Sequence, residues 1–157
     1  MFKKIFDLIL ILPVICVINF NCLALNAQIR NRLYNPIPID IKNNKISIED
    51  TLSEKDIPIG DGAFARDYVV NLKSGQKVVI DLISDNFDPL VKLMTPKGAT
   101  LGENDDAADG SSNSTLFYRI TKSGDYIIRV RGFGEAAGGN FTIKITTLYE
   151  QNQCPVN

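Results

Sequence analysis

Acidic side chains gather in two turn-rich segments between residues 85 and 109, and these side chains are the best placed in this chain to do chemistry. The two segments carry Asp85, Asp88, Glu103, Asn104, Asp105, Asp106 and Asp109. Loops rich in carboxylate and amide oxygens suit calcium, which takes about 6–8 oxygen ligands in flexible geometry. We therefore predict a calcium site formed by Asp105, Asp106, Asn104 and Asp88, acting on stability and not on catalysis. The EF-hand spacing is absent, and Asx turns at exposed corners would explain the same residues without a metal.

Catalytic constellations are excluded one by one. The chain has no histidine, which removes Ser-His-Asp and Cys-His catalysis and the usual zinc sites. The S-x-x-K match at 74–77 spans a turn and not a helix, and the G-x-G-x-x-A match at 132–137 precedes a strand where a dinucleotide site needs a helix. Carboxylate pairs could serve a glycosidase, but the chain has no Trp to stack on a sugar. We predict that the protein is not an enzyme.

The N-terminus has the order of a secretory signal peptide. Lys3 and Lys4 precede an apolar run at 8–18, and small residues follow at Ala24 and Ala27. A membrane-spanning helix needs about 20 apolar residues, so an uncleaved anchor is the weaker alternative. We predict cleavage after Ala27, no membrane span in the mature chain, and a secreted, periplasmic or cell-surface location.

The remaining 130 or so residues are one domain's worth. Removing 1–27 takes away Lys3, Lys4 and Asp7 and leaves 15 basic and 17 acidic residues. The basic residues are scattered and often alternate with apolar ones, which is typical of the solvent face of strands and predicts no nucleic-acid partner. Cys154 is the one cysteine left, so no internal disulfide can form and stability must come from the core.

Alternation of apolar and polar residues predicts strands at 67–72, 77–83, 114–120, 125–131 and 140–148, with a further strand around Val91 and Leu93. Turn residues separate them every 8–12 positions, and no window keeps a helical period. We predict an all-β fold: an antiparallel β-sandwich, jelly-roll or Greek-key-like, with seven to eight strands. The segment 28–56 is expected to be an extended arm that can include an edge strand, and 149–157 a tail.

The strand pattern also predicts the turns between strands and the residues of the core. Lys-Ser-Gly occurs at 73–75 and at 122–124, and we interpret the first as the turn of a hairpin and the second as the same chemistry recurring. Tyr126 is either a tyrosine corner, whose hydroxyl bonds the upstream backbone, or a plain core aromatic. The residues predicted to be buried are Ile80, Val91, Leu93, Tyr126, Ile128 and Phe141.

These motifs together carry a family resemblance. They are Asp67-Tyr68-x-Val70, Leu72-x-x-Gly75-Gln76, Phe87-Asp88-Pro89, Leu93-x-x-Pro96-x-Gly98, Glu103-Asn104-Asp105-Asp106, Ser123-Gly124-x-Tyr126 and Gly139-x-Phe141-x-Ile143. Over residues 57–148 the chain resembles the bacterial pre-peptidase C-terminal domain. The resemblance implies a jelly-roll-like sandwich that serves secreted enzymes as a non-catalytic accessory module. Related collagen-binding domains hold calcium near the first strand, where this chain offers Asp61 and Asp67 but Arg66 interrupts the acidic run.

Two functions remain open. The first is an exported, non-catalytic accessory or binding module that contacts an extracellular protein or a cell-surface polymer, through the corner loops or a sandwich face. The alternative is a folding or export helper for a separately encoded secreted peptidase. Neither requires a cofactor beyond the calcium considered above.

Overall fold

The computed structural model describes residues 35–60, 62–134 and 138–149. Every regular element in these ranges is a strand. The strands are β1 (Ile37–Pro38), β2 (Lys45–Leu52), β3 (Ile57–Gly60), β4 (Ala63–Leu72), β5 (Gln76–Ile83), β6 (Pro89–Met94), β7 (Thr100–Asn104), β8 (Ser114–Arg119), β9 (Gly124–Gly132) and β10 (Gly139–Tyr149). In this described part no helix is long and apolar enough to cross a membrane. The signal peptide predicted at 1–27 and most of the tail predicted at 149–157 lie outside the described residues.

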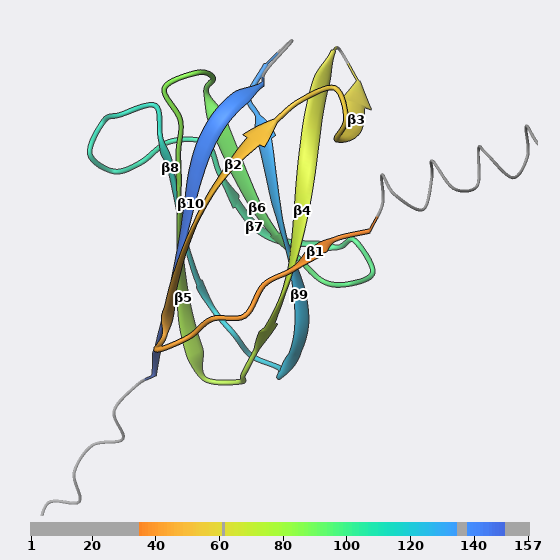
Figure 1. The fold of residues 1–157 in the computed structure, drawn as a ribbon. Helices are drawn as coiled ribbons and strands as arrows, with labels where there is room; N and C mark the ends of the chain where they lie inside the picture. Colours follow the sequence, from red (N-terminus) through yellow and green to blue (C-terminus); the bar gives the residue numbers. More distant parts are fainter. Residues whose placement is uncertain (1–34, 61, 135–137, 150–157) are drawn as a thin grey trace, which may run out of the picture. The chain divides into compact units, whose positions relative to one another are not determined.

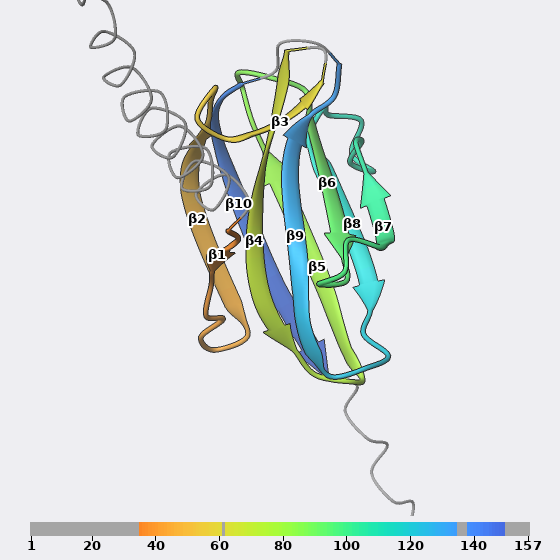
Figure 2. The same ribbon diagram turned by 90° about the vertical axis from the view of Figure 1, so that its right-hand side faces the viewer.

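The strands form two sheets that face each other (Figures 1 and 2). One has the order β1-β4-β9-β6-β7, with β3 also paired to β4, and the other has the order β2-β10-β5-β8. All pairs are antiparallel except β1 with β4. The predicted antiparallel β-sandwich is confirmed. The strands number ten because β1 and β3 are short additions to the edge of β4 and because the acidic segment contributes β7.

The core lies between the sheets, as the alternation predicts. Ile80, Val91, Leu93 and Ile128 are fully buried, and Tyr126 and Phe141 are nearly so. Strand side chains point alternately to opposite faces, so the burial of these six residues confirms the face assigned to their strands. Burying large aliphatic side chains is the main source of stability for a domain that has no disulfide.

The hairpin predicted at 73–76 is wrong. β4 belongs to the six-stranded sheet and β5 to the four-stranded one, so this turn carries the chain across the sandwich. The Gly75 N–H donates to Ile120 O at 2.8 Å and the Ile120 N–H donates to Gln76 O at 2.8 Å, which ties the turn to the residue that follows β8. Gly75 has φ +87°, a conformation that glycine adopts without strain.

The second Lys-Ser-Gly turn also crosses between the sheets and lies beside the first. It joins β8 to β9, which belong to different sheets. Ser74 N–H donates to Ser123 Oγ at 2.9 Å, and Ser74 Oγ donates to Thr121 O at 3.0 Å. The two similar turns therefore stabilise each other at one end of the sandwich.

Tyr126 forms a tyrosine corner. Its ring is buried at the start of β9, and its hydroxyl donates to Lys122 O at 2.6 Å. A buried phenol needs such a partner, so this bond fixes where the crossing chain enters the six-stranded sheet. The corner interpretation is confirmed, with the ring serving the core as well.

The segment expected as an arm contributes an edge strand, β2, which pairs with β10 from Lys45 to Leu52. Leu52 is buried in the core. The neighbouring Asp50 receives a short contact from Arg66 on β4 and a 2.8 Å hydrogen bond from the Tyr68 hydroxyl, while Arg66 Nε donates to Asp56 at 2.7 Å. Because β2 and β4 belong to different sheets, these bonds close one open side of the sandwich.

Burial and hydrogen bonds have opposite effects on the pKa of Asp50. Burial acts to raise the pKa of Asp50, but hydrogen bonds from Arg66, the Thr51 N–H and Tyr68 outweigh it and lower the pKa. Burial and the Asp50 carboxylate together raise the pKa of Tyr68. Asp50 is therefore ionised and Tyr68 neutral at neutral pH, the states in which the carboxylate accepts and the phenol donates.

Candidate functional site

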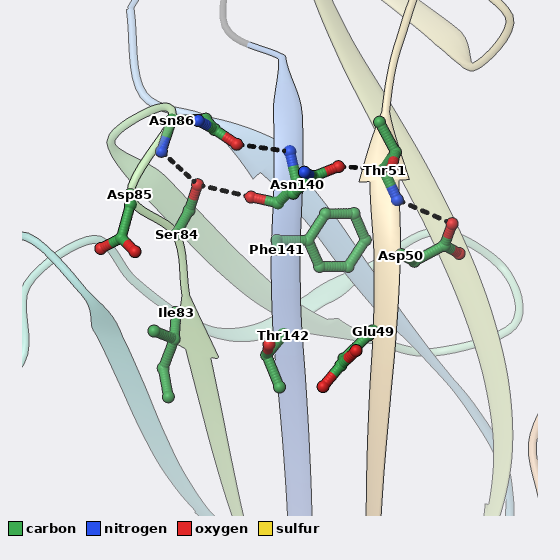
Figure 3. Close-up of a pocket in the computed structure, with 10 residues that line it drawn as sticks. All are labelled: Glu49, Asp50, Thr51, Ile83, Ser84, Asp85, Asn86, Asn140, Phe141 and Thr142. Carbon is green, nitrogen blue, oxygen red and sulfur yellow. Dashed lines mark hydrogen bonds between the residues drawn. The ribbon is translucent and has the colours of Figure 1, made fainter.

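A polar pocket opens on the outer side of the four-stranded sheet, between β2, β10 and the corner that follows β5 (Figure 3). Its volume is about 590 Å³. It is lined by Glu49, Asp50, Thr51, Ile83, Ser84, Asp85, Asn86, Asn140, Phe141 and Thr142. Carboxylates, hydroxyls and amides dominate this lining, so the pocket suits a polar or cationic group better than an apolar one.

Hydrogen bonds from the corner after β5 to the start of β10 shape one wall. Ser84 Oγ donates to Asn140 O at 2.9 Å and accepts the Asn86 N–H at 3.1 Å, and Asn86 Oδ1 accepts the Asn140 N–H at 2.8 Å. A Cβ on Gly139 would lie 2.5 Å from the Asn86 Cβ, and Gly139 has φ +128°. Glycine at 139 is what lets the corner approach β10 this closely.

The other wall is β2. Thr51 Oγ1 donates to Asn140 Oδ1 at 2.8 Å, and Asp50 is held by Arg66 and Tyr68 as described above. Several polar groups of the pocket are thus already held by hydrogen bonds within the protein. Glu49 and Asp85 lie on opposite sides of the pocket, with Thr142 between them (Figure 3).

The pocket holds hydroxyls and carboxylates. Its hydroxyls belong to Ser84, Thr51 and Thr142, and its carboxylates belong to Glu49, Asp50 and Asp85. Within the part of the chain that the structure describes, no three side chains among Cys, Asp and Glu are grouped so that they could hold a metal ion. The geometry supports binding of a polar group.

The predicted calcium residues lie at a different place, around the end of β7. Asn104 is the last residue of β7, and its side chain is already engaged: Nδ2 donates to Thr115 O at 2.7 Å, and Oδ1 accepts the Asp106 N–H at 3.1 Å. The second bond is an Asx turn, the metal-free explanation considered for this segment. Asn104 therefore shapes the loop through both ends of its side-chain amide.

One carboxylate of the same set, Asp88, has a shifted pKa. Burial, followed by the negative charges of Asp106 and Asp105, raises the pKa of Asp88. Calcium binding by these residues stays a prediction.

The other acidic residues named from the sequence have partners of their own. Glu103 lies on β7 and not in a loop, and it forms an ion pair with Lys92 on β6. Asp109 accepts bonds from the N–H and Oγ of Ser111 at 2.9 and 2.7 Å. Asp67 accepts two bonds from Arg129 at 2.7 and 2.8 Å, while Asp61 lies outside the described residues.

Sequence reasoning missed the pocket. Its walls come from three segments, around residues 50, 85 and 140. The Asn86-Phe87-Asp88 corner and the Gly138-Gly139-Asn140 step at the start of β10 were visible in the sequence, but only the pairing of β10 with both β2 and β5 places them together. A strand register was the missing information.

Comparison with known proteins agrees with this architecture. Residues 65–132 match the model of the bacterial pre-peptidase C-terminal domain, which confirms the resemblance inferred from the sequence motifs. No curated protein matches the sequence.

Two solved structures have a similar fold. PliG of Aeromonas hydrophila, a periplasmic lysozyme inhibitor of g-type lysozyme, is 14% identical with a TM-score of 0.55, over 73% of this chain and 96% of that chain. The pre-peptidase C-terminal domain of collagenase from Bacillus anthracis is 12% identical with a TM-score of 0.51, over 71% of this chain and 95% of that chain. At these identities the likeness shows the fold alone.

Proposed function

We propose that this chain, whose residues 65–132 belong to the bacterial pre-peptidase C-terminal domain family, is an exported, non-catalytic binding module whose partner is a protein. The observation that carries the proposal is the exposure of large apolar side chains on a sandwich whose core is otherwise complete. Among the described residues, Ile37, Phe117, Phe133, Leu148 and Tyr149 are exposed. Three of the five are aromatic, a type enriched at the centres of protein interfaces.

The polar groups support binding in preference to catalysis. In the pocket, Ser84, Asn86 and Asn140 are committed to backbone hydrogen bonds, and the chain has no histidine to act as a general base. The order of residues at the N-terminus supports export, through a signal peptide cleaved after Ala27 and release to the periplasm or the medium.

The likeness to PliG suggests the first partner to test. PliG is a periplasmic inhibitor of g-type lysozyme, and a β-sandwich without chemistry of its own is a suitable scaffold for an inhibitor. We therefore infer that the partner is an extracellular or periplasmic hydrolase. A secreted peptidase, as in the export-helper alternative, belongs to the same class.

Site-specific photo-crosslinking in the producing cell tests the proposal. A benzophenone amino acid is placed at Asp85 in the pocket or at Phe117 on the sheet face, with Ile127 on the outer face of the six-stranded sheet as the comparison. We expect a protein adduct of one defined mass from the exported fraction at Asp85 or Phe117 and none at Ile127. The absence of a protein adduct at both test positions would refute the binding proposal. Purified protein is then added to a g-type lysozyme, and slower lysis of cell walls would identify that partner.

A further inference from the structure

We propose that the pocket between β2, β10 and the corner after β5 binds an arginine side chain of the partner protein, between the carboxylates of Glu49 and Asp85 (Figure 3). This inference rests on the proposed function and names a contact by which the partner is recognised. The pocket volume of about 590 Å³ lies within the range of about 300–1,000 Å³ that is usual for ligand pockets. The pocket is therefore large enough for a guanidinium group and its aliphatic chain.

Strand pairing places the two carboxylates on opposite sides of the pocket. Glu49 on β2 is paired with Thr142 on β10, and Thr142 is paired with Ile83 on β5. Neighbouring strands lie about 4.8 Å apart, so the backbones at Glu49 and Ile83 are separated by about 10 Å. Asp85 follows Ile83 by two residues, in the corner after β5, and it lies across the pocket from Glu49 (Figure 3). The pocket is thus bounded by a carboxylate on each side of Thr142.

The lining of the pocket is acidic and contains no cation to compensate its charge. No lysine or arginine is among the described residues that line it. Arg66 contacts the third carboxylate, that of Asp50, which also accepts a hydrogen bond from Tyr68. The carboxylates of Glu49 and Asp85 therefore attract a cationic group supplied from outside the chain.

Two lysines lie near the pocket but outside its lining. Lys144 is two residues along β10 from Thr142, and it is paired in register with Asp81, an acid that opposes its charge. Lys55 is exposed in the turn after β2. Neither lysine is placed by the fold between the two carboxylates of the pocket.

Hydrogen bonds within the chain hold the pocket walls, and three of them converge on Asn140. Ser84 Oγ donates to its backbone oxygen at 2.9 Å, Asn86 Oδ1 accepts its N–H at 2.8 Å, and Thr51 Oγ1 donates to its Oδ1 at 2.8 Å. These bonds join β2, β10 and the corner after β5. Because the walls are already ordered, less conformational entropy is lost when a side chain enters the pocket.

The lining favours arginine over lysine. A guanidinium carries five N–H donors in a fixed plane and no acceptor, and the pocket offers acceptors on different sides: the carboxylates of Glu49 and Asp85 and the hydroxyl of Thr142. The ammonium group of lysine is more compact and more strongly hydrated. Arginine is also the basic residue that is enriched at the centres of protein interfaces.

The openness of the pocket favours a side chain of a protein over a free small cation. Glu49, Asp85 and Asn140 are all exposed, and an ion pair that stays in water contributes little to binding. A partner protein that covers the rim would exclude water from the same ion pair and so strengthen it.

The same sheet offers such a partner an apolar contact on the same outer face. Phe117 on β8 is 57% exposed and is paired with Val79 on β5. Val79 is four residues before Ile83, which lines the pocket. Each strand residue advances the chain by about 3.3 Å, so Phe117 lies roughly 13 Å from the pocket along the strands. An interface of ordinary size, about 800 Å² on each partner, covers both.

Short peptides test the pocket directly. The probe is a blocked pentapeptide with arginine at the centre of glycine and serine residues. Its matched controls carry lysine, or citrulline, which keeps the shape of arginine without the charge, and methylguanidine tests a free guanidinium. Each is titrated at millimolar concentration into the full exported chain labelled with 15N and followed by NMR. We expect the arginine peptide to shift the amides of Glu49, Asp85 and Asn140, and to bind less tightly at high salt.

The controls have defined outcomes. We expect the lysine peptide and methylguanidine to bind about threefold more weakly than the arginine peptide, and the citrulline peptide to cause no shifts. Equal binding of the citrulline peptide would overturn the ionic basis of the inference, and equal binding of the lysine peptide would overturn the choice of arginine. Tighter binding of methylguanidine than of the arginine peptide would overturn the inference in favour of a small free cation.

Paired variants locate the site. Glu49→Gln and Asp85→Asn should each weaken binding of the arginine peptide about fivefold, because each removes one carboxylate from the pocket. Glu54→Gln removes a carboxylate that is also exposed but lies in the turn after β2, outside the described lining, and it should leave binding unchanged. Thr142→Lys places a cation between the two carboxylates and should abolish binding. Equal weakening by Glu54→Gln and Glu49→Gln would overturn the location.

The crosslinking experiment separates this inference from the proposed function. Benzophenone at Phe117 leaves the pocket unchanged, so its adduct reports on the partner alone. We expect this adduct to be lost in the Glu49→Gln/Asp85→Asn double variant and kept in Glu54→Gln. An adduct that forms equally in the double variant would overturn the inference and leave the proposed function standing. No adduct from either Phe117 or Asp85 would refute the proposed function and, with it, this inference.

Discussion

Replacing Arg66 by methionine removes a guanidinium that contacts carboxylates from two segments, Asp50 on β2 and Asp56 in the turn before β3. Methionine keeps most of the side-chain volume, so the change is chiefly electrostatic. The Arg66 side chain is 18% exposed, Asp56 is 9% exposed and Asp50 is 28% exposed. The pair is thus more enclosed than a surface ion pair and less so than one in the core.

The expected cost follows from this intermediate burial. Removing one partner of a fully buried pair costs about 3–5 kcal/mol, because the other charge stays buried, whereas an exposed pair contributes about 0–1 kcal/mol. Asp56 would keep the Ser53 N–H at 2.8 Å and Asp50 would keep Tyr68. We therefore expect Arg66→Met to lower the free energy of unfolding by about 2–3 kcal/mol, between the two limits.

Urea-induced unfolding followed by circular dichroism measures this change. The control is Lys92→Met, which removes the cation from a pair whose Glu103 side chain is 52% exposed, and it should cost less than about 1 kcal/mol. Equal losses of unfolding free energy in the two variants would contradict the role given to burial. A loss below about 0.5 kcal/mol in Arg66→Met would contradict it too, since changes of that size are usual for surface sites.

The pH dependence gives a second check. Because hydrogen bonds hold the pKa of Asp50 below its ordinary value against the effect of burial, the unfolded state takes up the proton first as pH falls. The contribution of ionised Asp50 to the free energy of unfolding is therefore complete above the ordinary aspartate pKa of about 3.9. It is lost as pH falls through the lower pKa of Asp50 in the folded state. The difference in the free energy of unfolding between wild type and Arg66→Met should become smaller in that acidic range. A difference that stays constant down to the acid transition would refute the electrostatic account.

Three other outcomes follow from the fold. Ile80→Ala should lower the free energy of unfolding by about 2–5 kcal/mol, as cavity-forming changes do, and a change below about 0.5 kcal/mol in urea unfolding would mean that the face assignment is wrong. Tyr126→Phe should cost about 1–2 kcal/mol in the same assay because it leaves Lys122 O without its donor; an unchanged midpoint would show that water replaces the hydroxyl. If calcium binds the acidic corner, millimolar calcium should raise the melting temperature, and Asp105→Asn and Asp106→Asn should abolish the rise. An unmoved melting temperature in the parent would leave these carboxylates as turn residues.

The strands were predictable because alternation reports burial directly. Ile80 and Ile128 lie in runs where every second residue is apolar, and this period of two places those residues on the face that is buried. The tyrosine corner was also predictable, since it depends on residues four positions apart, Lys122 and Tyr126.

The pairing of strands was not predictable in the same way. A short glycine-containing turn such as 73–76 serves equally to reverse a hairpin or to cross a sandwich. The difference here lies in hydrogen bonds to Ile120 and Ser123, more than 40 residues away. The pocket depends on the same kind of distant pairing, so no local pattern marks it.

The place of the last strand has a consequence for the order of folding. β10 lies between β2 and β5 in the four-stranded sheet, and β9 lies between β4 and β6 in the other. The bond between Thr51 and Asn140 joins residues 89 positions apart, and such long-range pairings form slowly. Neither sheet can be completed until residues 124–149 have been synthesised, so β2 and β5 have no partner between them before that point. For a chain proposed to be exported, this delay keeps the sandwich unfolded until residue 149 has been made, and an unfolded polypeptide can pass through a narrow secretion channel.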